Sequence, residues 1–153
     1  LGAAIGATES QRGHRRTLLV GDLNADPFQY GVYAPTGLHA VPTRRLALQQ
    51  SRTVSGTAYR FFFNPMWRFF GDATPGPPGT YFRRQAQPDV RFWYMFDQVL
   101  LRPELLQYLD DRDLEIVTAD GPTSLAGAGD GRPDPRVGSD HFPILIRLSY
   151  PGV

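Results

Sequence analysis

Short apolar runs bounded by glycine, proline or aspartate divide the chain into strand-like segments. Leu18 to Val20 ends at Gly21, and the longest run covers residues 92–101 with aromatic and aliphatic side chains. Runs of this length and composition are typical of strands. The pattern predicts a short buried strand at residues 17–20 and further strands at residues 80–83, 92–101, 114–118 and 143–148.

Capping residues and prolines mark short helices between these strands. The first 13 residues suggest the tail of a helix followed by a loop. Asp26 before Pro27 is interpreted as a helix cap rather than a ligand, with a helix or turn over residues 27–32. Further helices are predicted at residues 43–50, 66–70 and 103–109, the first of them capped by Thr43. Strands that alternate with short helices indicate a mixed α/β or α+β domain.

Aromatic residues are concentrated between residues 57 and 70. In single-strand binding proteins such a run stacks on bases, which would point to a nucleic-acid substrate. Consecutive aromatics in a strand also serve both faces of a sheet, and ordinary core packing is the favoured interpretation. His14 and His39 lie in loop contexts, and we expect them to be solvated rather than functional.

Composition narrows the classes of protein only slightly. The chain has 153 residues, which suggests one domain, and a net charge of +1, which argues for no particular partner. It has no cysteine, so disulfides, thiolate metal sites and cysteine nucleophiles are excluded. All 16 basic residues are arginine, a bias better explained by a GC-rich genome than by phosphate binding. No run approaches the ~20 apolar residues of a membrane span. A soluble, cytoplasmic protein is favoured, although the lack of cysteine does not fix the compartment.

Two polar motifs at strand edges carry the chemistry. The first is Gly-Asp-Leu-Asn at residues 21–24, and the second is Ser-Asp-His at residues 139–141. Magnesium prefers oxygen ligands and takes one or two carboxylates, which Asp22 and Asp140 can supply. Asn24 and His141 can donate hydrogen bonds to phosphate oxygens. The combination is what a metal-assisted phosphoester hydrolase needs.

Asp97 interrupts the apolar run at residues 92–101 and is the candidate partner of His141. A lone aspartate there is costly to bury unless it is paired, and a carboxylate partner would fix the histidine tautomer. Alternatives remain open: Asp97 can point outward from an edge strand, the first motif can be an ordinary turn, and His141 can be a surface residue.

The three motifs together resemble the endonuclease/exonuclease/phosphatase superfamily, which has the deoxyribonuclease-I-like fold. The resemblance rests on Gly-Asp-Leu-Asn after a strand, Asp-Gln-Val-Leu-Leu at residues 97–101, and Ser-Asp-His-Phe-Pro-Ile at residues 139–144. It implies that Asp22 orients or deprotonates the attacking water, that Asn24 contacts the scissile phosphate and that Asp97 pairs with the catalytic histidine. It also implies that Asp140, with Asp22, binds Mg²⁺ or Mn²⁺, and that His141 stabilises the transition state.

The resemblance covers only the C-terminal half of the family domain. It implies an α+β fold that is half of a four-layer sandwich, with one mostly antiparallel mixed sheet and helices on one face. The chain, residues 1–153, is therefore expected to be a partial domain. It lacks the family's metal-binding glutamate, because Glu9, Glu104 and Glu115 do not lie in that context.

The resulting prediction is a metal-dependent phosphoesterase that is incomplete without an N-terminal half or a partner chain, with nucleic acid among its possible substrates. The alternative is a truncated, non-catalytic half-domain that acts as an interaction module through an uncovered sheet face.

Overall fold

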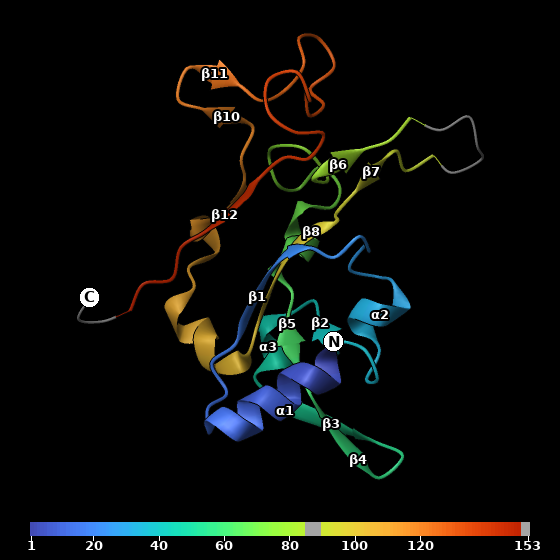
Figure 1. Ribbon diagram of the computed structural model, residues 1–153, viewed down its shortest axis with the longest axis vertical. Coiled ribbons are helices and arrows are strands. Elements are labelled where there is room, and N and C mark those ends of the chain that lie inside the picture. The colour runs from blue at the N-terminus through green and yellow to red at the C-terminus, as the bar shows by residue number, and fades with distance from the viewer. Residues whose placement is uncertain (85–89, 151–153) are drawn as a thin grey trace.

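The computed structural model describes residues 1–84 and 90–150 and has an α+β architecture. A four-stranded mixed sheet with the order β1-β8-β5-β2 forms its centre (Figure 1). β1 (Leu18–Asp22) and β5 (Phe62–Phe63) pair antiparallel with β8 (Asp97–Leu101), and β2 (Ala40–Val41) pairs parallel with β5. The sheet is thus mixed and mostly antiparallel, as predicted.

Short helices and two-stranded sheets complete the described chain. The helical elements are α1 (Gly2–Arg12), α2 (Tyr30–Tyr33), α3 (Arg44–Ala47), η1 (Pro65–Phe69), η2 (Pro103–Tyr108) and η3 (Asp111–Asp113). The two-stranded sheets are β3 (Ser51–Val54) with β4 (Thr57–Arg60), β6 (Tyr81–Phe82) with β7 (Trp93–Tyr94), β9 (Leu114–Ile116) with β12 (Ile144–Ile146), and β10 (Ala119–Asp120) with β11 (Thr123–Ser124). None of the described helices is long and apolar enough to cross a membrane.

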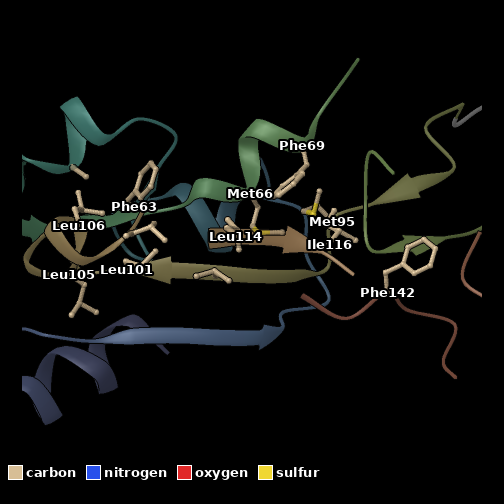
Figure 2. Close-up of a cluster of buried hydrophobic side chains, with 13 residues drawn as sticks. Phe63, Met66, Phe69, Met95, Leu101, Leu105, Leu106, Leu114, Ile116 and Phe142 are labelled. Atoms are coloured by element: carbon tan, nitrogen blue, oxygen red, sulfur yellow. The ribbon is translucent and has the colours of Figure 1, made fainter. Parts of the chain in front are cut away.

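Successive residues of β8 enter two separate hydrophobic clusters. Val99 and Leu101 belong to the larger cluster, which also contains buried residues of η1 and η2 (Figure 2). Leu100 belongs to the smaller one with Phe62, against which Ile5 of α1 packs. Side chains alternate between the faces of a strand, so the two clusters lie on opposite faces of the sheet. Helical segments therefore cover both faces, whereas the resemblance implied one.

β1 is an edge strand and is not buried as predicted. Leu18 and Val20 are 38% and 45% exposed, and Leu19 between them packs against the smaller cluster. The order of the sheet explains the difference, because β1 has β8 on one side and no described strand on the other. The apolar run at residues 18–20 has the composition of a central strand but occupies an edge.

Two local predictions also need correction. Residues 92–101 form two strands, since the chain leaves β7 after Tyr94 and enters β8 at Asp97. Asp26 does not cap a helix: α2 begins at Tyr30 with Gln29 as its N-cap residue, and Asp26 is buried. The Asp26 carboxylate instead accepts hydrogen bonds from the backbone N–H of Met95 at 2.8 Å and from Arg91 at 3.2 Å.

Other local predictions are confirmed. Thr43 caps α3, and its hydroxyl accepts a hydrogen bond from the N–H of Leu46. The helix predicted at residues 66–70 is η1, and the Asn64 side chain, which was not predicted as its cap, accepts a hydrogen bond from the N–H of Met66. The aromatic run is largely core, since Phe61, Phe62 and Phe63 are buried.

Candidate functional site

The pairing of β1 with β8 brings Asp22 of the first motif next to Asp97, the predicted partner of His141. Asp22 is the last residue of β1 and lies directly opposite Asp97, the first residue of β8. Residues opposite one another across an antiparallel pair project from the same face, and like charges there are destabilising. The two carboxylates are thus brought together at one end of the sheet, where a cationic group would relieve their repulsion.

The turn after β1 has a defined geometry. The Asp22 carboxylate accepts a hydrogen bond from the backbone N–H of Asn24 at 2.7 Å. Asn24 has φ 50, a left-handed conformation that asparagine adopts more readily than most residues. Both side chains are exposed. The conformation of the turn therefore depends on the carboxylate at position 22 and on a residue that tolerates positive φ at position 24.

Asp97 and His141 form the hydrogen-bonded pair predicted from the sequence. The distance from His141 Nδ1 to Asp97 Oδ2 is 2.7 Å, and the two side chains are 23% and 18% exposed. With its Nδ1–H donated to the carboxylate, the imidazole leaves Nε2 free to act on another molecule. The alternative in which Asp97 points outward without a partner is excluded by this contact.

Thr80 connects the segments that carry Asp97 and His141, and sequence analysis did not single it out. Its hydroxyl accepts a hydrogen bond from the N–H of Asp97 at 3.1 Å, and its carbonyl accepts one from the N–H of Phe142 at 2.7 Å. Thr80 is fully buried. No local signal distinguishes a threonine after a glycine and proline loop, so this role could not have been found from the sequence.

Aromatic rings surround the His141 imidazole. The ring of Tyr81 lies 4.8 Å from it, and Tyr81 is bridged to His141 through the backbone. Phe96 stacks on Tyr81 at 5.5 Å and lies 6.4 Å from the imidazole. At the same position the Ser139 hydroxyl accepts a hydrogen bond from the N–H of His141 at 3.1 Å. Ring packing and backbone contacts together fix the position of His141.

A buried amide pair holds the turn after β1 against the sheet. Gln98 is fully buried in β8, and its side chain donates to the carbonyl of Ala25 and accepts from Asn64 Nδ2. Asn64 in turn accepts from the N–H of Met66 through its own carbonyl oxygen. Gln98 was also missed, although a polar residue inside an apolar run was visible in the sequence.

The carboxylates form only part of a metal site. Asp140 is exposed next to His141, and its carboxylate accepts a hydrogen bond from the Ser139 hydroxyl at 3.5 Å. Within residues 1–84 and 90–150, no group of three or more histidine, aspartate or glutamate side chains could hold a metal ion. The oxygens of Asp22 and Asp140 suit Mg²⁺ by type, but the described residues do not assemble a complete coordination sphere.

The structure thus brings Asp22, Asn24, Asp97 and His141 to one end of the β1–β8 pair, with Asp140 beside His141 in the sequence. Comparison with known proteins adds no relative to this description. No family model, curated protein or solved structure matches the chain.

Proposed function

We propose that this protein hydrolyses phosphoesters. In the proposed reaction an activated water attacks phosphorus at the end of the β1–β8 pair. The single observation that carries the proposal is the 2.7 Å hydrogen bond between Asp97 and His141. A histidine oriented by a carboxylate is a common device for proton transfer and for stabilising developing charge. The resemblance to the endonuclease/exonuclease/phosphatase superfamily agrees with this assignment.

His141 would act through Nε2, because Nδ1 is held by Asp97. In its imidazolium form it donates a hydrogen bond to a non-bridging phosphate oxygen, where negative charge grows as water attacks. Asp97 fixes the orientation of the ring and stabilises the charged imidazole. This division of roles follows from the contact at Nδ1 and from the partial exposure of the pair.

Asp22 and Asn24 would serve the attacking water and the phosphate. The Asp22 oxygen that accepts the Asn24 N–H is committed to the turn, which leaves the second oxygen to orient or deprotonate water. The Asn24 amide is exposed and can donate to a phosphate oxygen. Both groups precede the same loop, so a change in the turn would affect both at once.

Mg²⁺ or Mn²⁺ is proposed as the cofactor on the chemistry of Asp22 and Asp140. The metal would neutralise phosphate oxygens, and Mg²⁺ usually completes its coordination with water and substrate oxygens. The repulsion between Asp22 and Asp97 across the strands also favours a cation nearby. Because the described residues supply an incomplete set of ligands, further ligands are expected from water, from substrate or from another polypeptide segment.

The experiment that tests the proposal is hydrolysis of bis-p-nitrophenyl phosphate and of DNA with Mg²⁺ or with EDTA. The Asp140→Ala, His141→Ala double variant should lose about 10²- to 10⁴-fold in rate, as loss of a proton-transfer or charge-stabilising group does. Asp120→Ala, which alters an exposed aspartate in β10, is the matched control and should retain the wild-type rate. Equal rates in all three proteins would refute catalysis at this site.

The second candidate is a non-catalytic interaction module, and the exposure of Leu18 and Val20 on the edge strand favours it. Exposed apolar side chains beside unpaired strand groups are a typical surface for association. Under this alternative the double variant would bind partners as the wild type does, and replacement of Leu18 and Val20 by threonine would abolish binding. Loss of hydrolysis in the double variant would argue against it.

A further inference from the structure

A cleft lies at the end of β8 that is remote from the candidate active site. Its volume is about 740 Å³, and it is lined by residues of α1, of β4 and of the segment between α2 and β2. Arg102, which directly follows β8, is one of its lining residues, whereas Asp97 begins that strand. Five residues of a strand separate two positions by about 17 Å. Figure 1 shows α1 and the β3–β4 hairpin together at this end of the molecule.

The size of the cleft suits a small molecule. Ligand sites in proteins typically have volumes of about 300–1,000 Å³. Glycines of α1, Gly2 and Gly6, contribute to the lining, and a β-carbon placed on Gly6 would meet no heavy atom within 4 Å. The cleft is therefore open next to Gly6, and no other group packs against this position.

Positive charge in the cleft exceeds negative charge. Arg102 and Arg60 both pair with the buried carboxylate of Glu9, and Arg60 also pairs with Glu104 at 2.9 Å. These two arginines are thus balanced by two glutamates. Arg15 lines the same cleft, and its guanidinium makes no ion pair or hydrogen bond with the described residues.

Arg15 and Arg60 both line the cleft, so their positive charges face the same space. Burial lowers the pKa of Arg60, and the positive charges of Arg102 and Arg15 lower it further against the opposing pull of the two glutamates. Like charges held near one another in a concave site attract a counter-ion. A planar guanidinium binds phosphate or carboxylate oxygens in pairs.

His39 closes one side of the cleft without adding to its charge. It is 5% exposed and adopts φ 54, and its ring packs 4.5 Å from Phe61 and 6.0 Å from Tyr59. Burial lowers the pKa of His39, which favours the uncharged ring. Its Nδ1 has no hydrogen-bond partner among the described residues. The expectation that His39 is solvated is therefore wrong, because the ring is buried at the wall of the cleft.

We propose that this cleft binds a small organic anion of about the size of a nucleoside monophosphate, whose phosphate or carboxylate group is held by Arg15. The apolar part of the ligand lies against Tyr59, which also lines the cleft. This site is separate from the proposed hydrolytic site and goes beyond that function. Three observations support this site: Arg15 has no ion-pair partner among the described residues, it lines the cleft together with Arg60 and Tyr59, and the cleft is open next to Gly6.

The test is isothermal titration with AMP as the probe, in EDTA and at low salt, with adenosine as the uncharged comparison. We expect AMP to bind the wild-type chain and adenosine to bind at least about tenfold more weakly, because the charge-assisted contacts are lost. Arg15→Ala should weaken AMP binding by about tenfold or more for the same reason. Gly6→Leu should abolish binding by filling the cleft.

Matched controls distinguish the cleft from other effects. Ala7→Leu places the same side chain on an exposed position of α1 outside the cleft, and Arg16→Ala removes the neighbouring arginine, which does not line it. Both should bind AMP as the wild type does, and so should His141→Ala. The proposal is overturned if AMP does not bind, if adenosine binds equally well, or if Gly6→Leu retains wild-type affinity while remaining folded by circular dichroism.

Discussion

The hydroxyl of Thr80 accepts a hydrogen bond from the backbone N–H of Asp97 at 3.1 Å, and this contact anchors the residue that holds His141. The carbonyl of the same threonine accepts from the N–H of Phe142, one position after the histidine. Thr80 therefore fixes the backbone on both sides of the Asp97–His141 hydrogen bond. Because it is fully buried, no water can replace its hydroxyl without rearrangement.

Replacement of Thr80 by valine should loosen this anchor while it keeps the shape of the side chain. The change leaves the Asp97 N–H without an acceptor and should cost about 1–3 kcal/mol of unfolding free energy, measured in urea. Amide hydrogen exchange of Asp97 should speed up in Thr80→Val and stay slow in Thr80→Ser, which keeps the hydroxyl. Equal exchange in the two variants would show that the contact is not formed in solution.

The orientation of His141 should depend on Asp97. In the wild type the carboxylate holds the proton on Nδ1, so the neutral ring is confined to one tautomer. Asp97→Ala removes that acceptor, and ¹⁵N NMR of the histidine side chain should then report a mixture of both tautomers. His14, an exposed histidine, serves as the internal reference and should be unchanged. An unaltered His141 spectrum would contradict the pairing.

Sequence reasoning succeeded where local chemistry determines the outcome. Thr43 was predicted to cap a helix, because a side-chain oxygen there satisfies a free backbone N–H. Asp97 was recognised from its cost in an apolar strand, which predicted a partner. Each of these inferences required information from only a few neighbouring positions, or from one unusual residue in a run.

Other features depend on segments that meet only in the folded chain. The β3–β4 hairpin was missed because its strands are mostly exposed and lack apolar alternation, although Ser55 and Gly56 both have the positive φ of a tight hairpin turn. Asp26 accepts hydrogen bonds from Met95 and Arg91, which come from another part of the chain. The local sequence predicts a helix cap at Asp26. In the folded chain its carboxylate instead binds groups that are distant in the sequence.

Leu18 and Val20 should be nearly dispensable for stability if β1 is an edge strand. The Leu18→Thr, Val20→Thr double variant should change the unfolding free energy by less than about 0.5 kcal/mol per site, since threonine suits a strand and both positions are exposed. Leu100→Ala, in the adjacent strand, should cost about 2–5 kcal/mol because its side chain is fully buried. A double variant as unstable as Leu100→Ala would mean that the edge is covered in solution, which sedimentation would detect.

Glu9 should tie α1 to the sheet in a pH-dependent manner. Its carboxylate pairs with Arg102 at 2.8 Å and with Arg60 at 3.1 Å, and it accepts the Thr17 hydroxyl at 2.6 Å. Burial alone would raise the pKa of Glu9, but these hydrogen bonds and positive charges hold it below its ordinary value. Glu9→Gln leaves Arg102 buried without its counter-ion and should cost about 3–5 kcal/mol at pH 7.

The sign of the pH effect follows from the lowered pKa. The unfolded chain takes up a proton on Glu9 at a higher pH than the folded chain, so the stabilisation is complete above the unfolded pKa of about 4.3. It is lost as pH falls through the lower folded pKa. The difference in unfolding free energy between wild type and Glu9→Gln should therefore shrink as pH falls from 5 toward the folded pKa in chemical denaturation. Glu115→Gln, at an exposed position in β9, should show no such difference, and a gap for Glu9→Gln that stays constant would contradict the role of its charge.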